Sequence, residues 1–424
     1  MIIILTSINR ILWGITTILL IYAGVYFSKK LKFIQFNIRD MFTGFKRSGY
    51  EKVSPFETLM LTLGARIGVG SLAGVALAVY FGGPGTIFWM WIATFVVAPN
   101  AYVESFLGVL FHRKIDNVYQ GGPSYYINYG LNNKWLGKIY ALLIIITYIF
   151  GFSTIQANTI AKSIESFAGI NPLITGILLS LITGYVILKG ASYIIKISSK
   201  IMPFIVVIYL IISGYVILSN ITLLPLILKT IVVEAFNFKA FGSGLLTTFI
   251  IGFQRGIFSN EAGIGSGAIA ASTVDNDDAR GQGMIQIIGI YFTTLVLCTL
   301  TAIMILMSNY SDITFINVNG IEITQYALNY HLGSIGEVVL VLTIFVFAFS
   351  TIISGYYYGE NSLKFIKSNS NSKSIFVLKL ITICLLTVGS VVRASLLWDF
   401  VDILIAILGI INIYAIYKLR KKVK

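Results

Sequence analysis

Ionisable side chains are scarce in this sequence of 424 residues, in which 11% are charged and 57% are hydrophobic. Soluble domains carry roughly 25% charged residues, so the composition excludes an ordinary water-soluble globular protein. The mean hydropathy of +0.86 agrees with that exclusion. The chain instead offers many apolar runs close to the ~20 residues that a helix needs to cross a bilayer. We therefore predict an all-α integral membrane protein with the lipid bilayer as its surroundings.

Cysteine and histidine are scarcer still, with two of each. Cys298, Cys384, His112 and His331 are far apart in sequence, which argues against a zinc cluster and a disulfide framework. The apolar runs hold no clustered histidine or cysteine and no paired aspartates, which argues against a membrane-embedded enzyme. We expect no enzymatic activity and no cofactor.

The net charge of +14 could suggest a nucleic-acid partner. The basic residues, however, lie between apolar runs, where a positive-inside bias would place them, so we expect no nucleic-acid binding. Arg10 interrupts the first apolar run, which we interpret as a retained helix rather than a signal peptide. The apolar runs predict eleven spans near residues 11–28, 57–81, 86–111, 137–163, 172–188, 201–218, 244–270, 284–307, 336–363, 375–392 and 397–417.

The loops orient these spans. Residues 29–52 hold seven lysines and arginines, and if this loop is cytoplasmic, alternation also places residues 113–114, 189–196, 364–373 and the basic run 418–424 inside. The opposite loops are poor in cations, which predicts an outside N-terminus and a cytoplasmic C-terminus in the cell membrane. Residues 223–236 and 322–330 predict short external helices.

Two spans contain dense glycines. One has Gly64, Gly68 and Gly70 before Ser71, and the other reads Gly263-Ile-Gly-Ser266. Each glycine costs a helix roughly 1 kcal/mol relative to alanine. Unpaired backbone is tolerated at membrane depth only beside a cavity, so paired breaks indicate a transporter site with inverted repeats. Close helix packing by small residues is the alternative interpretation.

Charged residues accompany both breaks. Arg66 lies two residues before one Gly-x-Gly-Ser element and Glu261 two residues before the other, with Arg255 and Glu104 also inside spans. Buried charges need partners. We hypothesise that Arg66 or Arg255 pairs directly with Glu261 in a static structural ion pair.

Three polar residues are weaker candidates. Gln156 lies mid-span, where its amide could bond a substrate amine or a neighbouring helix. Ser350 and Thr351 could offer hydroxyls to a sodium ion or back-bond to their own helix.

Several longer stretches resemble the alanine or glycine:cation symporter family, whose members include sodium:alanine symporters. The resemblance covers nearly all the chain after the first span and is carried by residues 74–91, 119–127, 200–204, 255–266, 347–351 and 357–360. It implies a leucine-transporter-type fold, in which ten core helices form two inverted five-helix repeats, here after one extra N-terminal helix. The implied divisions are 1–55 for the extra helix and basic loop, 56–218 and 244–418 for the repeats, 219–243 for an external helix, and 419–424 for a basic tail.

The resemblance also implies secondary active transport, with sodium-coupled uptake of alanine, glycine or another small neutral amino acid by alternating access. Backbone groups near Gly68 and Gly70 would face the substrate carboxylate, Gln156 its amine and Phe258 its side chain. Val69, Ser71, Ser259 and Gly355 would complete the substrate pocket. Sodium, the coupling ion, would lie between carbonyls near Gly64 and Ile67 and the hydroxyls of Ser350 and Thr351.

The sequence departs from the family at several of these positions. Val69 and Ser71 stand where the family usually has threonine and asparagine, and Thr293 stands where a subgroup has aspartate. Gly355 replaces a usual tryptophan or asparagine, which predicts an enlarged pocket suited to a bulkier side chain. A lost hydrogen-bonding group can change discrimination by orders of magnitude. A proton-coupled or altered-specificity carrier, and a channel or receptor on the same fold, remain the alternatives.

Overall fold

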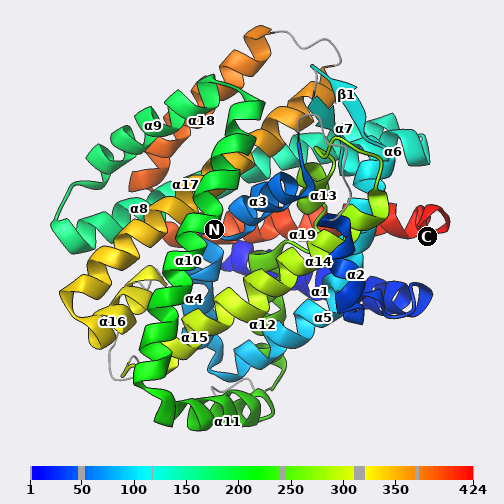
Figure 1. Ribbon diagram of the computed structural model, residues 1–424. Helices are drawn as coiled ribbons and strands as arrows, with labels where there is room; N and C mark the ends of the chain where they lie inside the picture. Colours follow the sequence, from blue (N-terminus) through cyan, green and yellow to red (C-terminus); the bar gives the residue numbers. More distant parts are fainter. Residues whose placement is uncertain are drawn as a thin grey trace.

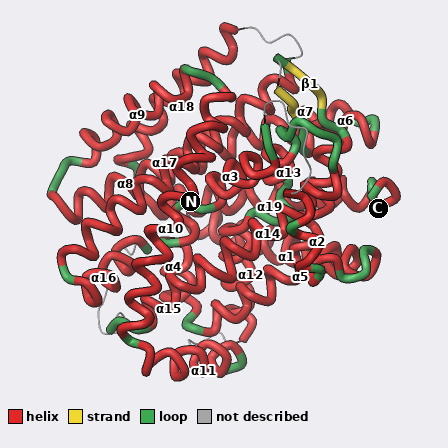
Figure 2. The backbone as a smooth tube through the Cα atoms, in the orientation of Figure 1, coloured by secondary structure: helices red, strands yellow, loops and turns green. Residues whose placement is uncertain are grey.

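The computed structural model describes residues 2–45, 53–116, 118–237, 245–309, 320–367 and 372–423. Within these ranges the elements are helices, apart from one antiparallel hairpin of β1 (Arg113–Ile115) and β2 (Val118–Gln120) (Figure 2). The α-helices are α1 (Ile2–Lys30), α2 (Ile38–Met41), α3 (Pro55–Arg66), α4 (Ala73–Gly82), α5 (Gly85–Leu110), α6 (Pro123–Leu131), α7 (Lys134–Ile145), α8 (Ser153–Ala168), α9 (Pro172–Leu188), α10 (Ala191–Ser219), α11 (Leu224–Ala235), α12 (Leu245–Asn260), α13 (Ser266–Ala271), α14 (Ala279–Tyr291), α15 (Thr299–Leu306), α16 (Ile321–Leu332), α17 (Ser334–Ile366), α18 (Ser372–Val391) and α19 (Ala394–Lys418). Short 3-10 turns η1 (Ile34–Phe36), η2 (Thr43–Phe45) and η3 (Val69–Ser71) and π-helical turns η4 (Ile146–Phe152) and η7 (Phe292–Cys298) connect several of them.

By length and composition, eight helical runs of the described residues can cross a membrane, and the bent pair α3–α4 makes a ninth. The prediction of an all-α, multi-pass membrane protein is confirmed. Two of the eleven predicted spans remain predictions. Helix α9 has 17 residues, which is short for a full crossing, and α12 is separated from α13 by five residues.

The short elements lie at opposite ends of the helical bundle (Figure 1). Helices α11 and α16, which match the two predicted short helices, lie at the lower left of this view. The hairpin and α6 lie at the upper right and the C-terminus at the right, where Lys30 at the end of α1 contacts Arg420. The basic C-terminal run therefore lies away from α11 and α16.

The N-terminal helix α1 packs along α19 and α5. The indole nitrogen of Trp13 donates to the Asp402 carbonyl at 3.1 Å, and the Thr16 hydroxyl donates to the Ala406 carbonyl at the same distance. The Asn100 amide of α5 donates to the Leu20 carbonyl at 3.0 Å. Because lipid gives helices little hydrophobic reason to associate, such hydrogen bonds and close contacts hold α1 in place.

Candidate functional site

The first break separates α3 from α4, whose axes meet at an angle of 65°. Ile67, with φ −85° and ψ 75°, leaves the helical conformation directly after Arg66. The Val69 N–H then donates to Gln156 Oε1 at 3.1 Å instead of a carbonyl one turn back. The freed Ser71 carbonyl accepts a bond from the Thr301 hydroxyl at 3.0 Å. Side chains of neighbouring helices thus satisfy the opened backbone, as hydrocarbon surroundings require.

The second break lies between α12 and α13. Glu261, Gly263 and Gly265 all have positive φ, at 54°, 83° and 99°. Glycine adopts this left-handed conformation without penalty, which explains why the sequence has glycine at positions 263 and 265. The Gly263 carbonyl accepts from the Asn412 amide at 2.9 Å, and the Ile264 carbonyl accepts from the Tyr140 hydroxyl. The prediction that both spans are interrupted is confirmed.

The two breaks meet. A Cβ atom on Gly70 would lie 3.0 Å from the Phe258 ring, so the backbone of η3 and the last turn of α12 are in contact. The Ser71 and Ser259 hydroxyl oxygens are 3.5 Å apart, and Ser259 Oγ lies 2.9 Å from Cys298 Sγ. The residues that the resemblance places around the substrate in the break at η3, on α8 and on α12 therefore converge, and all are buried.

Helix α17 brings hydroxyl groups to the same place. The Thr351 hydroxyl donates to the Gly64 carbonyl at 3.0 Å. A Cβ atom on Gly64 would lie 2.6 Å from Ser350 Oγ and 2.9 Å from Ser354 Oγ. Both serine hydroxyls are fully buried, yet neither has a hydrogen-bond partner among the described residues. Buried hydroxyls are ordinarily paired. The corner formed by Gly64, Ser350 and Ser354 can therefore still bind a polar ligand or ion.

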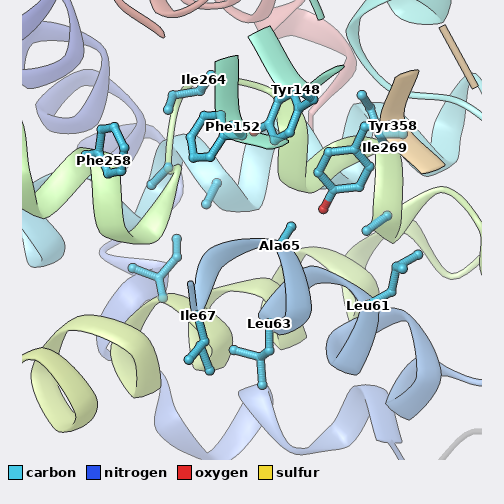
Figure 3. Packing of buried hydrophobic residues seen from close by; sticks show 14 of the residues in the cluster. Leu61, Leu63, Ala65, Ile67, Tyr148, Phe152, Phe258, Ile264, Ile269 and Tyr358 are labelled. Atoms are coloured by element: carbon cyan, nitrogen blue, oxygen red, sulfur yellow. The ribbon is translucent and has the colours of Figure 1, made fainter. Parts of the chain in front are cut away.

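Aromatic rings lie on one side of the contact between η3 and α12. Phe258, Phe152 and Tyr148 form a row across from Ala65 and Ile67 (Figure 3). The Tyr148 and Phe152 rings stack with centroids 4.9 Å apart, and the Phe152 and Phe258 centroids are 5.3 Å apart. Two of these rings lie in η4, whose wider π-helical turn changes the direction in which side chains leave the helix, a feature often seen at functional sites.

The sodium:alanine symporter family matches residues 1–424 of this sequence. The chain belongs to this family. It is 37% identical to the "Probable sodium/glutamine symporter GlnT" of Bacillus subtilis, covering 98% of this chain and 87% of that one. It is 32% identical to the sodium/alanine symporter AgcS of Methanococcus maripaludis, covering 96% and 92% respectively.

A solved structure shares the fold. It is described as the substrate-bound outward-open state of a Na+-coupled sialic acid symporter, and it superposes with a TM-score of 0.56 at 16% identity. The superposition covers 98% of this chain and 82% of that one. At this identity the similarity concerns the fold alone.

The predicted direct ion pair of Glu261 with Arg66 or Arg255 is wrong. The hydrogen-bonded Glu261 oxygen accepts from the Ser266 hydroxyl at 2.6 Å, and no arginine nitrogen of the described residues lies within salt-bridge distance of this carboxylate. The positive φ of Glu261 accompanies this turn towards α13. Arg66 donates to Gln286 at 3.2 Å and interacts with Glu261 and Glu104 only at longer range. Arg255 reaches α19, where it pairs with Asp402 at 2.7 Å.

The enlargement of the pocket expected at Gly355 stays a prediction, and the neighbour of this glycine is an aromatic ring. A Cβ atom there would lie 3.2 Å from Cδ1 of Tyr148, so the aromatic ring already fills the space that a larger residue would take. Glycine at this position leaves room for the Tyr148 ring. The expectation of a bulkier substrate stays a prediction.

Sequence reasoning missed two residues of the site. Asp402 lies in the last span, and the rule that singled out Arg255 as a charge inside an apolar run applies to it equally. Ser354 follows Ser350 by one helical turn, a spacing that places both hydroxyls on one face of α17. Either signal was available in the sequence.

Proposed function

We propose that this symporter takes up a small neutral amino acid together with sodium by alternating access. The proposal is carried by the buried, unpartnered Ser350 hydroxyl beside Gly64, where α17 meets the break of α3. Membership of the sodium:alanine symporter family and the names of the relatives support the same function.

Sodium would be bound at this corner. It is a hard cation that favours oxygen ligands. The carbonyls of Gly64 and Ile67 and the hydroxyls of Ser350 and Thr351 offer such a set, with Ser354 as an additional hydroxyl. The break supplies the carbonyls because the chain leaves the helical conformation at Ile67.

The amino acid would bind between η3 and α12. In the structure, the Val69 N–H and the Gln156 amide satisfy one another. A substrate carboxylate on the N–H groups of η3 and a substrate amine on Gln156 would replace this neutral bond with charge-assisted bonds, which are roughly twice as strong. Phe258, in contact with Gly70, would border a small side chain and limit its size.

The topology proposed for this function has eleven spans, with α9 and the pair α12–α13 included. The core would be two inverted five-helix repeats, which begin at the broken spans α3–α4 and α12–α13. The basic loops would lie in the cytoplasm and the N-terminus outside, following the positive-inside bias.

Uptake into proteoliposomes tests the function. We expect labelled alanine to accumulate when an inward sodium gradient is imposed and not when potassium replaces sodium. Unlabelled alanine and glycine should compete more effectively than glutamine, because Tyr148 fills the space at Gly355. Accumulation driven equally well by a proton gradient alone would contradict sodium coupling, and stronger competition by glutamine would contradict a small substrate.

The Ser350→Ala variant tests the sodium site separately. Removing one oxygen atom that binds a charged group costs about 1.5 kcal/mol of binding free energy. We therefore expect that half-maximal uptake needs about tenfold more sodium. Thr343→Val is the matched control, because the Thr343 hydroxyl donates to the Val339 carbonyl of its own helix at 2.8 Å. If both variants needed the same sodium concentration for half-maximal uptake, Ser350 would not be a sodium ligand.

A further inference from the structure

A basic pocket lies where α1 ends, and none of its lining residues belongs to the proposed transport site. It has a volume of about 360 Å³. Its walls come from the end of α1, the segment that follows it, α5 and the start of α14. The lining residues are Lys30, Leu31, Lys32, Ile34, Asn37, Tyr102 and Arg280.

The chain makes a sharp turn to form this pocket. Lys32 and Phe33 both have positive φ, at 53° and 58°, which is costly for residues with a side chain. The Phe33 N–H donates to the Ser28 carbonyl at 2.7 Å and fixes the turn. Backbone strain of this kind persists where the surrounding contacts impose it, and it is often found at functional sites.

The segment after the turn is anchored against two spans. The Tyr291 hydroxyl of α14 donates to the Gln35 carbonyl at 2.6 Å. The Phe36 ring stacks on Phe95 of α5 with centroids 6.0 Å apart. The pocket is therefore bounded by elements that are tied to the helical bundle.

Positive charge exceeds negative charge around the pocket. The Lys32 ammonium group has no hydrogen-bond or ion-pair partner among the described residues, and the Lys30 ammonium group donates to the backbone carbonyl of Arg420. The Arg280 guanidinium, which is 64% exposed, pairs with Asp40 at 3.1 Å. Three cations thus lie near two carboxylates, Asp40 from the neighbouring turn and Asp278, which caps the first turn of α14.

Large apolar side chains surround this charge. Phe33, Phe36, Ile38 and Phe42 are between 53% and 64% exposed. In a membrane protein, apolar side chains beside a cationic pocket are typical of the boundary between lipid headgroups and acyl chains. A soluble anion would contact only the cationic pocket. A phospholipid would contact the pocket with its headgroup and the phenyl rings with its acyl chains.

We propose that this pocket binds the phosphate headgroup of an anionic phospholipid. Lys32 and Arg280 contact the phosphate, since arginine and lysine donate charge-assisted hydrogen bonds to its oxygens. Basic pockets between spans on the cytoplasmic side are suited to anionic headgroups. The exposed rings of Phe33 and Phe36 lie against the acyl chains of the same lipid.

Native mass spectrometry of the full chain in detergent tests this site, with phosphatidylglycerol and phosphatidylcholine as probes. We expect one phosphatidylglycerol to be retained in preference to phosphatidylcholine. Neutralising two cations in the Lys32→Gln, Arg280→Gln double variant should weaken phosphatidylglycerol binding about 30-fold. The single variant Lys32→Gln, which leaves the Arg280–Asp40 pair intact, should show an intermediate loss and serves if the double variant does not fold.

The control variant Lys196→Gln, Lys200→Gln removes two exposed cations of α10 that do not line the pocket, and it should bind as the wild type does. Equal retention of both lipids, or equal losses in the control and the pocket variants, would overturn the proposal. Displacement of phosphatidylglycerol by inorganic phosphate as readily as by the lipid itself would identify a free-anion site and would overturn it as well.

Discussion

The Gly64→Ala variant is expected to lose sodium-driven uptake by about 100-fold or more, because a displacement of 1 Å at a positioned site can cost that much. The new methyl group would lie 2.6 Å from Ser350 Oγ and 2.9 Å from Ser354 Oγ. Both hydroxyls would have to move away from the break. Initial rates of alanine uptake in proteoliposomes, measured over a range of sodium concentrations, provide the test.

A second glycine of the same broken span supplies the control for this variant. A Cβ atom on Gly74 would have Trp398 as its nearest neighbour, at an ordinary contact distance of 3.7 Å, so Gly74→Ala should transport normally. Alanine is favoured over glycine in a helix by about 1 kcal/mol, so neither substitution weakens its helix intrinsically. Uptake by Gly64→Ala within a factor of two of Gly74→Ala would mean that sodium binds elsewhere.

The Asp402→Asn variant is expected to lower the free energy of unfolding by about 3–5 kcal/mol, because it leaves Arg255, whose side chain is only 14% exposed, without its counter-charge. The Asp402 side chain is 2% exposed and accepts from Arg255 at 2.7 Å and from Gln254 at 2.8 Å. The Arg255 guanidinium also lies over the rings of Phe258 and Trp398. Uptake should therefore fall together with the thermal stability of the detergent-purified protein.

Asp399→Asn is the matched control, because Asp399 lies one turn earlier on α19 and, among the described residues, accepts only a long bond of 3.5 Å from Asn9. Removing both charges in the Arg255→Gln, Asp402→Asn double variant should recover part of the lost stability, since the unpaired charge causes most of the cost. If Asp402→Asn were as stable as Asp399→Asn, the pair would not hold α12 against α19.

The sequence predicted the local breaks well because their cause is local. Glycine density around Gly68 and Gly263 opposes a regular helix wherever it occurs, and the structure has both interruptions at these positions. The contact between Gln156 and Val69 fits the expectation that Gln156 lies at the site, although its role towards a substrate remains a proposal.

Pairwise contacts over long sequence separations were predicted less well. Glu261 and Arg66 occupy similar places beside their breaks, which suggested a direct pair, but Ser266 lies closer to Glu261 and takes the bond. The partner of Arg255 is 147 residues away, and no periodic pattern connects the two. The contact of Gly355 with Tyr148 joins two different spans, so the sequence around Gly355 did not predict it.

Composition and the spacing of apolar runs determined that this chain is a multi-pass helical membrane protein, because bilayer thickness and unpaired peptide groups constrain every crossing segment alone. Glycine density determined where two of those segments open. Only the tertiary structure decided that Ser350, Ser354 and Gly64 share one corner and that Arg255 binds Asp402. These contacts depend on the relative rotation of separate helices, which is set by packing over the whole bundle and not by any local run of residues.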